Sequence, residues 1–139
     1  MNTADNTSEF NEKSVTLTHT DCESLLSELP SWGKVTVIII HAGSVFEFKG
    51  EFPKGSKAHG FYNLDSDGLG FEGHINTDKI SSIELQSKLH RGRPSYALVF
   101  STEKETLFKV FLGRDSEGNI LPNQLNRFQQ LEENAQNIQ

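Results

Sequence analysis

The fold is decided by residues 34–52, which read KVTVIIIHAGSVFEFKGEF. The run 35–40 is rich in β-branched residues and almost entirely apolar, which predicts a strand buried on both faces. Ala42-Gly43-Ser44 then signals a turn. In 45–52 the phenylalanines share one parity and the charged residues share the other, which predicts a half-buried strand. These two strands are expected to be neighbours in a sheet.

Outside this stretch, short apolar segments predict five more strands, at 59–64, 69–75, 80–89, 95–100 and 106–112. Turns are expected at 65–68 and 102–105, and a loop at 53–56. Turn-length connections imply antiparallel pairing. A capping box, Thr20 to Glu23, predicts a helix over 20–29. A second helix is expected from Pro122, with Leu125, Phe128 and Leu131 as its apolar stripe.

The fold class that follows is α+β, a large antiparallel sheet flanked by an N-terminal and a C-terminal helix. The 139 residues are enough for one domain. Both ends of the chain are polar and lack an apolar period. We therefore expect a flexible segment at 1–13, a single domain at 14–131 and a flexible tail at 132–139.

Composition excludes several classes of function. The net charge of −6 argues against non-specific nucleic-acid binding and against a polybasic membrane anchor. Cys22 is the single cysteine, which excludes an internal disulfide, a zinc ribbon and an iron–sulfur cluster. We see no signal-peptide pattern, and the longest apolar run, 35–40, is too short to cross a bilayer. A cytoplasmic protein without membrane insertion is expected.

Two of the five histidines have unusual settings. His41 ends the most apolar strand, where its ring is either satisfied by a backbone carbonyl or available to a ligand. His74 lies beside Gly70 and Gly73, which leave room for a flat ligand, although an exposed strand histidine would look the same. A basic run at 88–93 is either a solvated edge or a carboxylate-binding patch. Spacing alone leaves these alternatives open.

Several segments, in order and at compatible spacings, carry a family resemblance. Residues 32–36, 40–42 and 46–55 look like the opening hairpin of the ChuX/HutX/HuvX haem-utilisation family. His59–Leu64 resembles its HGYFNL segment, 68–75 its GxxGHI segment, 108–115 its KxFxGRD signature and 124–128 its closing helix. The resemblance runs from about Trp32 to Leu131. We expect the 108–115 motif to be structural, because none of its groups is a good iron ligand.

The resemblance implies cytosolic binding and trafficking of haem b, a homodimer, and a haem-donor or haem-acceptor protein. It also implies a fold similar to each half of the larger two-repeat haem-degrading proteins, and the N-terminal extension of the family is shortened here. Two histidines that ligate haem in a member of the family fall on His41 and His74. For a porphyrin with apolar walls and propionates that bind cations, the candidates are Phe46, Phe48, Phe61 and Tyr62 for the walls and Arg93 or Lys49 for the propionates. Tyr62 is in addition a candidate iron ligand.

Two other functions compete with a haem carrier. A haem-degrading oxygenase needs an open iron position for O₂, which two histidine ligands on one iron would block. A divalent-metal protein would need His41, His59 and His74 to converge, since neutral imidazoles suit zinc.

Overall fold

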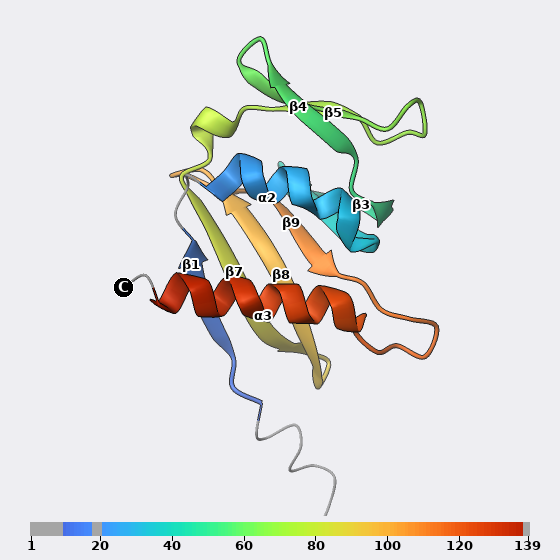
Figure 1. The fold of residues 1–139 in the computed structure, drawn as a ribbon, viewed down its shortest axis with the longest axis vertical. Coiled ribbons are helices and arrows are strands. Elements are labelled where there is room, and N and C mark those ends of the chain that lie inside the picture. Colours follow the sequence, from blue (N-terminus) through green and yellow to red (C-terminus); the bar gives the residue numbers. More distant parts are fainter. Residues whose placement is uncertain (1–9, 18–20, 138–139) are drawn as a thin grey trace, which may run out of the picture.

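In the computed structural model, which describes residues 10–17 and 21–137, six strands form one antiparallel sheet of order β1-β7-β8-β9-β2-β3 (Figure 1). The strands are β1 (Lys13–Leu17), β2 (Lys34–His41), β3 (Ser44–Glu51), β7 (Ser82–His90), β8 (Arg93–Ser101) and β9 (Thr106–Leu112). The predicted α+β class with a large antiparallel sheet is confirmed.

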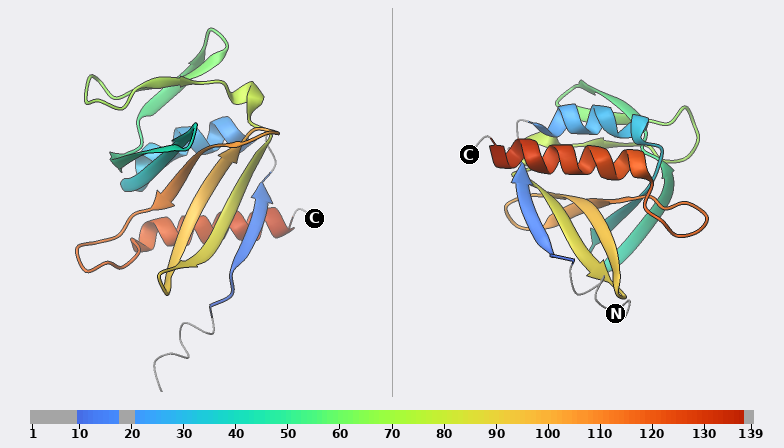
Figure 2. Two further views of the ribbon diagram at one scale, coloured as in Figure 1. Left: turned by 180° about the vertical axis from the view of Figure 1, so that it is seen from behind. Right: turned by 60° about the horizontal axis from the view of Figure 1, so that its bottom comes forward.

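Two helices cover one face of this sheet. Figures 1 and 2 show α2 (Cys22–Glu28) and α3 (Pro122–Asn137) lying across the strands on the same side. A short 3₁₀ helix, η2 (Leu29–Trp32), continues α2. The buried core between the layers includes Leu26, Leu29, Val37, Leu85, Leu98 and Phe128. The predicted pair of flanking helices is therefore present, and the core lies between them and the sheet.

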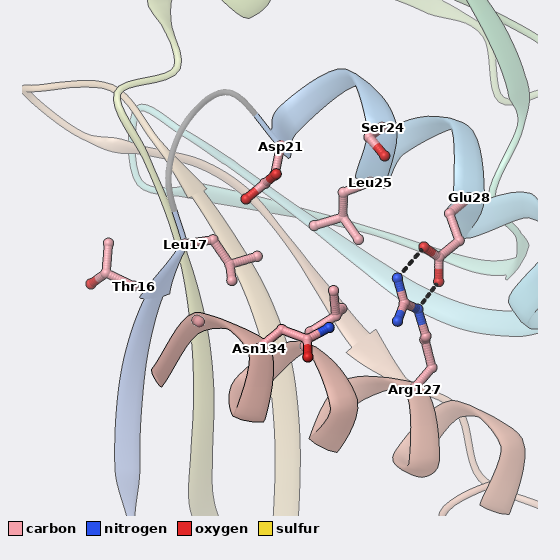
Figure 3. A pocket seen from close by; sticks show the side chains of 10 residues that line it. Thr16, Leu17, Asp21, Ser24, Leu25, Glu28, Arg127 and Asn134 are labelled. Carbon is pink, nitrogen blue, oxygen red and sulfur yellow. Dashed lines mark hydrogen bonds and ion pairs between the residues drawn. The ribbon is translucent and has the colours of Figure 1, made fainter. Parts of the chain in front are cut away.

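An ion pair joins the two helices. Arg127 on α3 donates to both carboxylate oxygens of Glu28 on α2, with Nε–Oε2 2.5 Å and Nη2–Oε1 2.9 Å (Figure 3). The indole nitrogen of Trp32 also donates to Glu28, at 2.8 Å. Partial burial opposes ionisation of Glu28, but the hydrogen bonds from Arg127 and Trp32 and the charge of Arg127 together lower its pKa. The pair fixes one helix against the other.

A separate three-stranded sheet packs on α2 at one end of the large sheet (Figures 1 and 2). It consists of β4 (Lys54–Ala58), β5 (Phe61–Asp65) and β6 (Gly73–Ile75), followed by the 3₁₀ helix η3 (Thr77–Lys79). Lys57 of β4 donates to Thr77 at 2.8 Å and lies 3.3 Å from Glu23 of α2. This excursion between β3 and β7 carries His74.

Three hairpin turns have the same backbone conformation. Ala42-Gly43, His59-Gly60 and Arg91-Gly92 each have positive φ at both residues, with values between 50° and 84°. Such pairs form the mirror-image turns that match the right-handed twist of the strands they join. The turn predicted at 42–44 is confirmed. His59, predicted to begin a strand, lies instead in the turn between β4 and β5.

Other predicted elements differ in extent. The predicted loop 53–56 includes the start of β4, and β1 was not predicted. The predicted strand 69–75 is reduced to 73–75, because Gly68 and Gly70 adopt positive φ and Leu69 is 86% exposed. The run 35–40 is not buried on both faces, since Ile40 is exposed. In the predicted capping box, Thr20 lies outside the described residues.

Helices, strands and contacts of the described residues reach past positions 14 and 131. β1 begins at Lys13, and Phe10 makes an edge-to-face contact with Tyr96. α3 continues to Asn137, past the boundary predicted at residue 131. The reason is Glu132, which is buried and accepts a hydrogen bond from Ser87 at 3.4 Å. A polar side chain thus anchors the last turns of a helix that composition alone marks as a loose tail.

The 108–115 motif makes scaffold contacts, as expected. The amide of Gly113 donates to Gln124 Oε1 at 2.7 Å, and Gln124 Nε2 donates to the carbonyls of Trp32 at 2.9 Å and Lys34 at 2.7 Å. A Cβ at Gly113 would collide with the Lys34 carbonyl, which explains the glycine. Asp115 Oδ1 accepts from two amides of the following loop, at 2.9 and 3.0 Å.

Candidate functional site

His41 lies on an exposed hairpin tip beside an exposed phenylalanine. β2 and β3 pair with Ile39 opposite Phe46 and His41 opposite Ser44. His41 and Phe46 are therefore diagonal neighbours on one face of the hairpin, about 7–8 Å apart at Cα. His41 is exposed, and Phe46 is 58% exposed. An exposed phenylalanine beside an exposed imidazole is a surface suited to a flat, apolar ligand with a metal at its centre.

His74 has the same kind of neighbour on the small sheet. Phe61 is 39% exposed, and its ring centroid lies 6.2 Å from that of His74 in an edge-to-face arrangement. His74 pairs with Asn63 across β5 and β6, and His74 Nδ1 lies 2.6 Å from Asn63 Oδ1. Because residues two apart in a strand share a face, Phe61, Asn63 and His74 lie on one face of this sheet.

An aromatic contact connects the two regions. Phe48 shares the face of Phe46 on β3, and its ring lies 4.6 Å from that of Phe71. Phe71, which also contacts Phe52 at 5.9 Å, comes three residues before His74. The candidates His41, Phe46 and Phe48 are thus on one surface of the hairpin, and Phe71 ties that surface to the start of β6.

Tyr62 is placed differently from the other candidates. It is 3% exposed and points to the core side of β5, where its ring packs so tightly on Gly55 that a Cβ there would collide with it. Burial, and then the charges of Glu23 and Cys22, raise the pKa of Tyr62. Among the described residues its hydroxyl has no hydrogen-bond partner. A ligand at the surface cannot reach this oxygen in the present conformation.

The two candidate cations are not brought together with His41. Lys49 pairs with Thr36 and so lies on the opposite face of the hairpin from Phe46 and Phe48. Arg93 starts β8, and it donates to the Gly118 carbonyl at 2.7 Å. The strand register puts Arg93 and His41 toward opposite ends of the sheet, separated by nine residue steps, or roughly 30 Å at about 3.3 Å per residue.

Two concavities lie elsewhere on the surface. One, of about 330 Å³, lies between β1, α2 and α3, with the Glu28–Arg127 pair in its wall (Figure 3). The other, of about 650 Å³, lies on the uncovered face of the large sheet, and its lining includes Lys49. Neither is lined by His41 or His74. Both histidines therefore stand on open surface.

A zinc-type site is not formed. Within the described residues, no three histidine, cysteine, aspartate or glutamate side chains gather in a way that could hold a metal ion. His41, His59 and His74 are all among the residues described, so the three imidazoles do not converge.

Two residues of this region were not among the predicted site residues. Asn63 and Phe71 contact His74 and Phe48, respectively. Asn63 lies inside the 59–64 segment that carries the resemblance, and its parity with Phe61 was a signal that it shares the face of that ring. No sequence pattern could have placed Phe71, because the alternation of residues 69–75 predicts a strand there and Phe71 lies in a loop before β6.

The family model for haem utilisation ChuX/HutX matches residues 15–131. The chain belongs to this family. The resemblance stated from the sequence is confirmed. A curated relative is the intracellular heme transport protein HutX of Vibrio cholerae, 41% identical over 112 residues. The match covers 80% of this chain and 58% of HutX, so the chain spans little more than half the length of that relative.

Several solved structures share the fold. A crystal structure of ChuX superposes with a TM-score of 0.81 at 27% identity, covering 89% of this chain and 78% of ChuX. A protein from Erwinia carotovora superposes with a TM-score of 0.82 at 30% identity, covering 88% and 76% of the two chains. The E. coli heme oxygenase ChuS, at 14% identity, shows the fold alone, with a TM-score of 0.72 over 85% of this chain and 36% of ChuS.

Within the described residues, no helix is both long enough and apolar enough to span a bilayer.

Proposed function

We propose that this protein is an intracellular haem carrier, which binds haem b as cargo and passes it on without chemistry of its own. One observation carries the proposal: each of the two candidate histidines stands exposed beside an exposed phenylalanine, His41 beside Phe46 and His74 beside Phe61. Haem iron accepts a neutral imidazole nitrogen, and the porphyrin requires apolar contact. The family, and the transport protein HutX within it, support the same function.

The residues fit this cargo unequally. His41 and His74 supply the iron ligands, and Phe46, Phe48 and Phe61 supply contact with the ring. Tyr62 is not included among the haem contacts, because its hydroxyl is buried under Gly55. Arg93 lies too far from His41 of the same chain, and Lys49 lies on the opposite face of the hairpin, to hold propionates of a haem at His41. In this proposal they act only on a haem held by a second subunit.

A homodimer would complete sites that stand open in one chain. The sequence-based reason for a dimer is a sheet face that the two helices leave uncovered and that carries apolar side chains. The uncovered face carries Thr36, Lys49 and Lys109 together with the partly buried Ile38 and Phe111. Three exposed apolar side chains lie at the β2–β3 tip, Ile40, Val45 and Phe46, and the first two are on this uncovered face. We therefore propose that a dimer buries this tip, and a monomer by light scattering across the micromolar range would contradict it.

The oxygenase alternative makes an opposite spectroscopic prediction. Two imidazoles on one iron leave no position for O₂, so haem on this protein should survive added reductant and oxygen. Loss of the Soret band with biliverdin or iron release would favour the oxygenase.

Titration with hemin tests the carrier. The parent protein should develop a saturating Soret band, and His41→Ala and His74→Ala should each weaken binding and alter the spectrum. His90→Ala is the matched control, because His90 is an exposed histidine at the opposite end of the sheet from His41. If both variants titrate like the parent and the control, the assigned histidines are not the ligands.

A further inference from the structure

The side-chain amide of Asn63 has only one orientation that satisfies its surroundings. One of its two terminal atoms faces three backbone carbonyls, those of Ala58 at 3.0 Å, Phe61 at 3.1 Å and Ser56 at 3.3 Å. Carbonyl oxygens only accept hydrogen bonds, so the atom that faces them must be the NH₂ group. The amide oxygen, Oδ1, must then point the other way, toward His74.

This orientation decides which nitrogen of His74 carries hydrogen. Oδ1 accepts hydrogen bonds and cannot donate, so His74 Nδ1, 2.6 Å away, must be the N–H donor. A neutral imidazole has a single N–H, and Nε2 is therefore left with its lone pair. The ring is exposed, and Phe61 on the same face flanks it.

We propose that Asn63 is a positioning residue, which fixes His74 in the Nδ1–H tautomer and presents Nε2 as an electron-pair donor to haem iron. The proposal rests on the haem-carrier function and deepens it. Hydrogen-bond partners behind a ligating histidine orient the ring and raise its basicity, and their loss weakens metal binding by about 10- to 100-fold. The same backbone carbonyls that close the β4–β5 turn thereby determine the donor atom offered at the surface.

The first measurement needs no haem. Long-range ¹⁵N NMR correlations of the haem-free protein should show His74 protonated at Nδ1, and Asn63→Ala should abolish that preference. His59→Asn is the control, because His59 is an exposed imidazole in the adjoining turn at φ 55°, a conformation that asparagine tolerates. If His74 in the parent protein is protonated at Nε2, the proposal is overturned whatever haem does.

Hemin titration then tests the positioning role of Asn63 separately from the haem-carrier function. Asn63→Ala should weaken binding by about 10- to 100-fold, and His59→Asn should match the parent. If Asn63→Ala stays folded by circular dichroism and binds haem like the parent while His74→Ala loses binding, Asn63 has no positioning role and the carrier function stands. If His74→Ala itself binds like the parent, the ligand assignment under the proposed function fails instead.

Discussion

Gln124 should contribute more to stability than any other polar side chain on α3. Its amide sits fully buried between three backbone groups, the Gly113 amide and the carbonyls of Trp32 and Lys34. In Gln124→Leu, the Gly113 N–H is left without this acceptor, which costs about 1–3 kcal/mol. The two donated bonds add about 0.5–1.5 kcal/mol each. The Trp32 carbonyl also accepts a hydrogen bond from Asn123 at 3.1 Å. The loss of the Gln124 bond to Trp32 should therefore cost an amount near the lower limit of that range.

The expected total is about 2–6 kcal/mol, which for a chain of this length, at about 3–4 °C per kcal/mol, lowers the Tm by roughly 6–24 °C. Thermal unfolding by circular dichroism and urea unfolding would measure it. Gln129→Leu is the matched control, because Gln129 is exposed on the same helix. If Gln124→Leu melts within about 3 °C of this control, a difference of about 1 kcal/mol or less, the hydrogen bonds of the buried amide do not stabilise the protein as argued. The folded fraction should bind haem normally, since Gln124 contacts neither histidine site.

Two further predictions concern buried polar groups. Burial raises the pKa of Glu132 in the folded chain above its ordinary value of 4.5. The stability that comes from its protonated form is therefore present below pH 4.5 and is lost as the pH rises through the raised pKa. Glu132→Gln should raise the Tm at neutral pH, and this gain should disappear near pH 4. A Tm gain that is constant with pH would contradict this. Tyr62→Phe removes a buried hydroxyl that has no partner among the described residues, so it should leave stability unchanged or raise it by up to about 1 kcal/mol. Its hemin spectrum should match the parent's, and a shifted Soret band would instead make Tyr62 a ligand.

The strands of the opening hairpin were predictable because local and tertiary preferences agree there. Parity in 45–52 placed Phe46 and Phe48 on one face and Lys49 on the other, and the structure keeps that division. Because Lys49 lies on the opposite face from Phe46 and Phe48, it cannot contact the same side of a ligand as these phenylalanines. Parity in β5 likewise separates Phe61 from Tyr62, although both were candidates.

What sequence reasoning could not supply was long-range arrangement. The chain leaves the large sheet at Phe52-Pro53, between β3 and β4, and returns to it after η3, which a run of alternating residues does not reveal. β1 carries only two buried side chains, Val15 and Leu17, too few for a period to stand out. The distance between Arg93 and His41 follows from strand order, which no local pattern encodes.

The position of Cys22 beneath the three-stranded sheet makes it a built-in chemical probe. Burial, and secondarily the charge of Glu23, raise the pKa of this thiol to about 11 despite the opposing charge of Lys57. At neutral pH only about one molecule in ten thousand then carries the reactive thiolate. A thiol reagent reacts with Cys22 only when the small sheet separates from α2, so the labelling rate reports how often this local opening occurs. Because that sheet carries His74, labelling kinetics with and without hemin would report whether cargo holds the sheet closed, without an engineered cysteine.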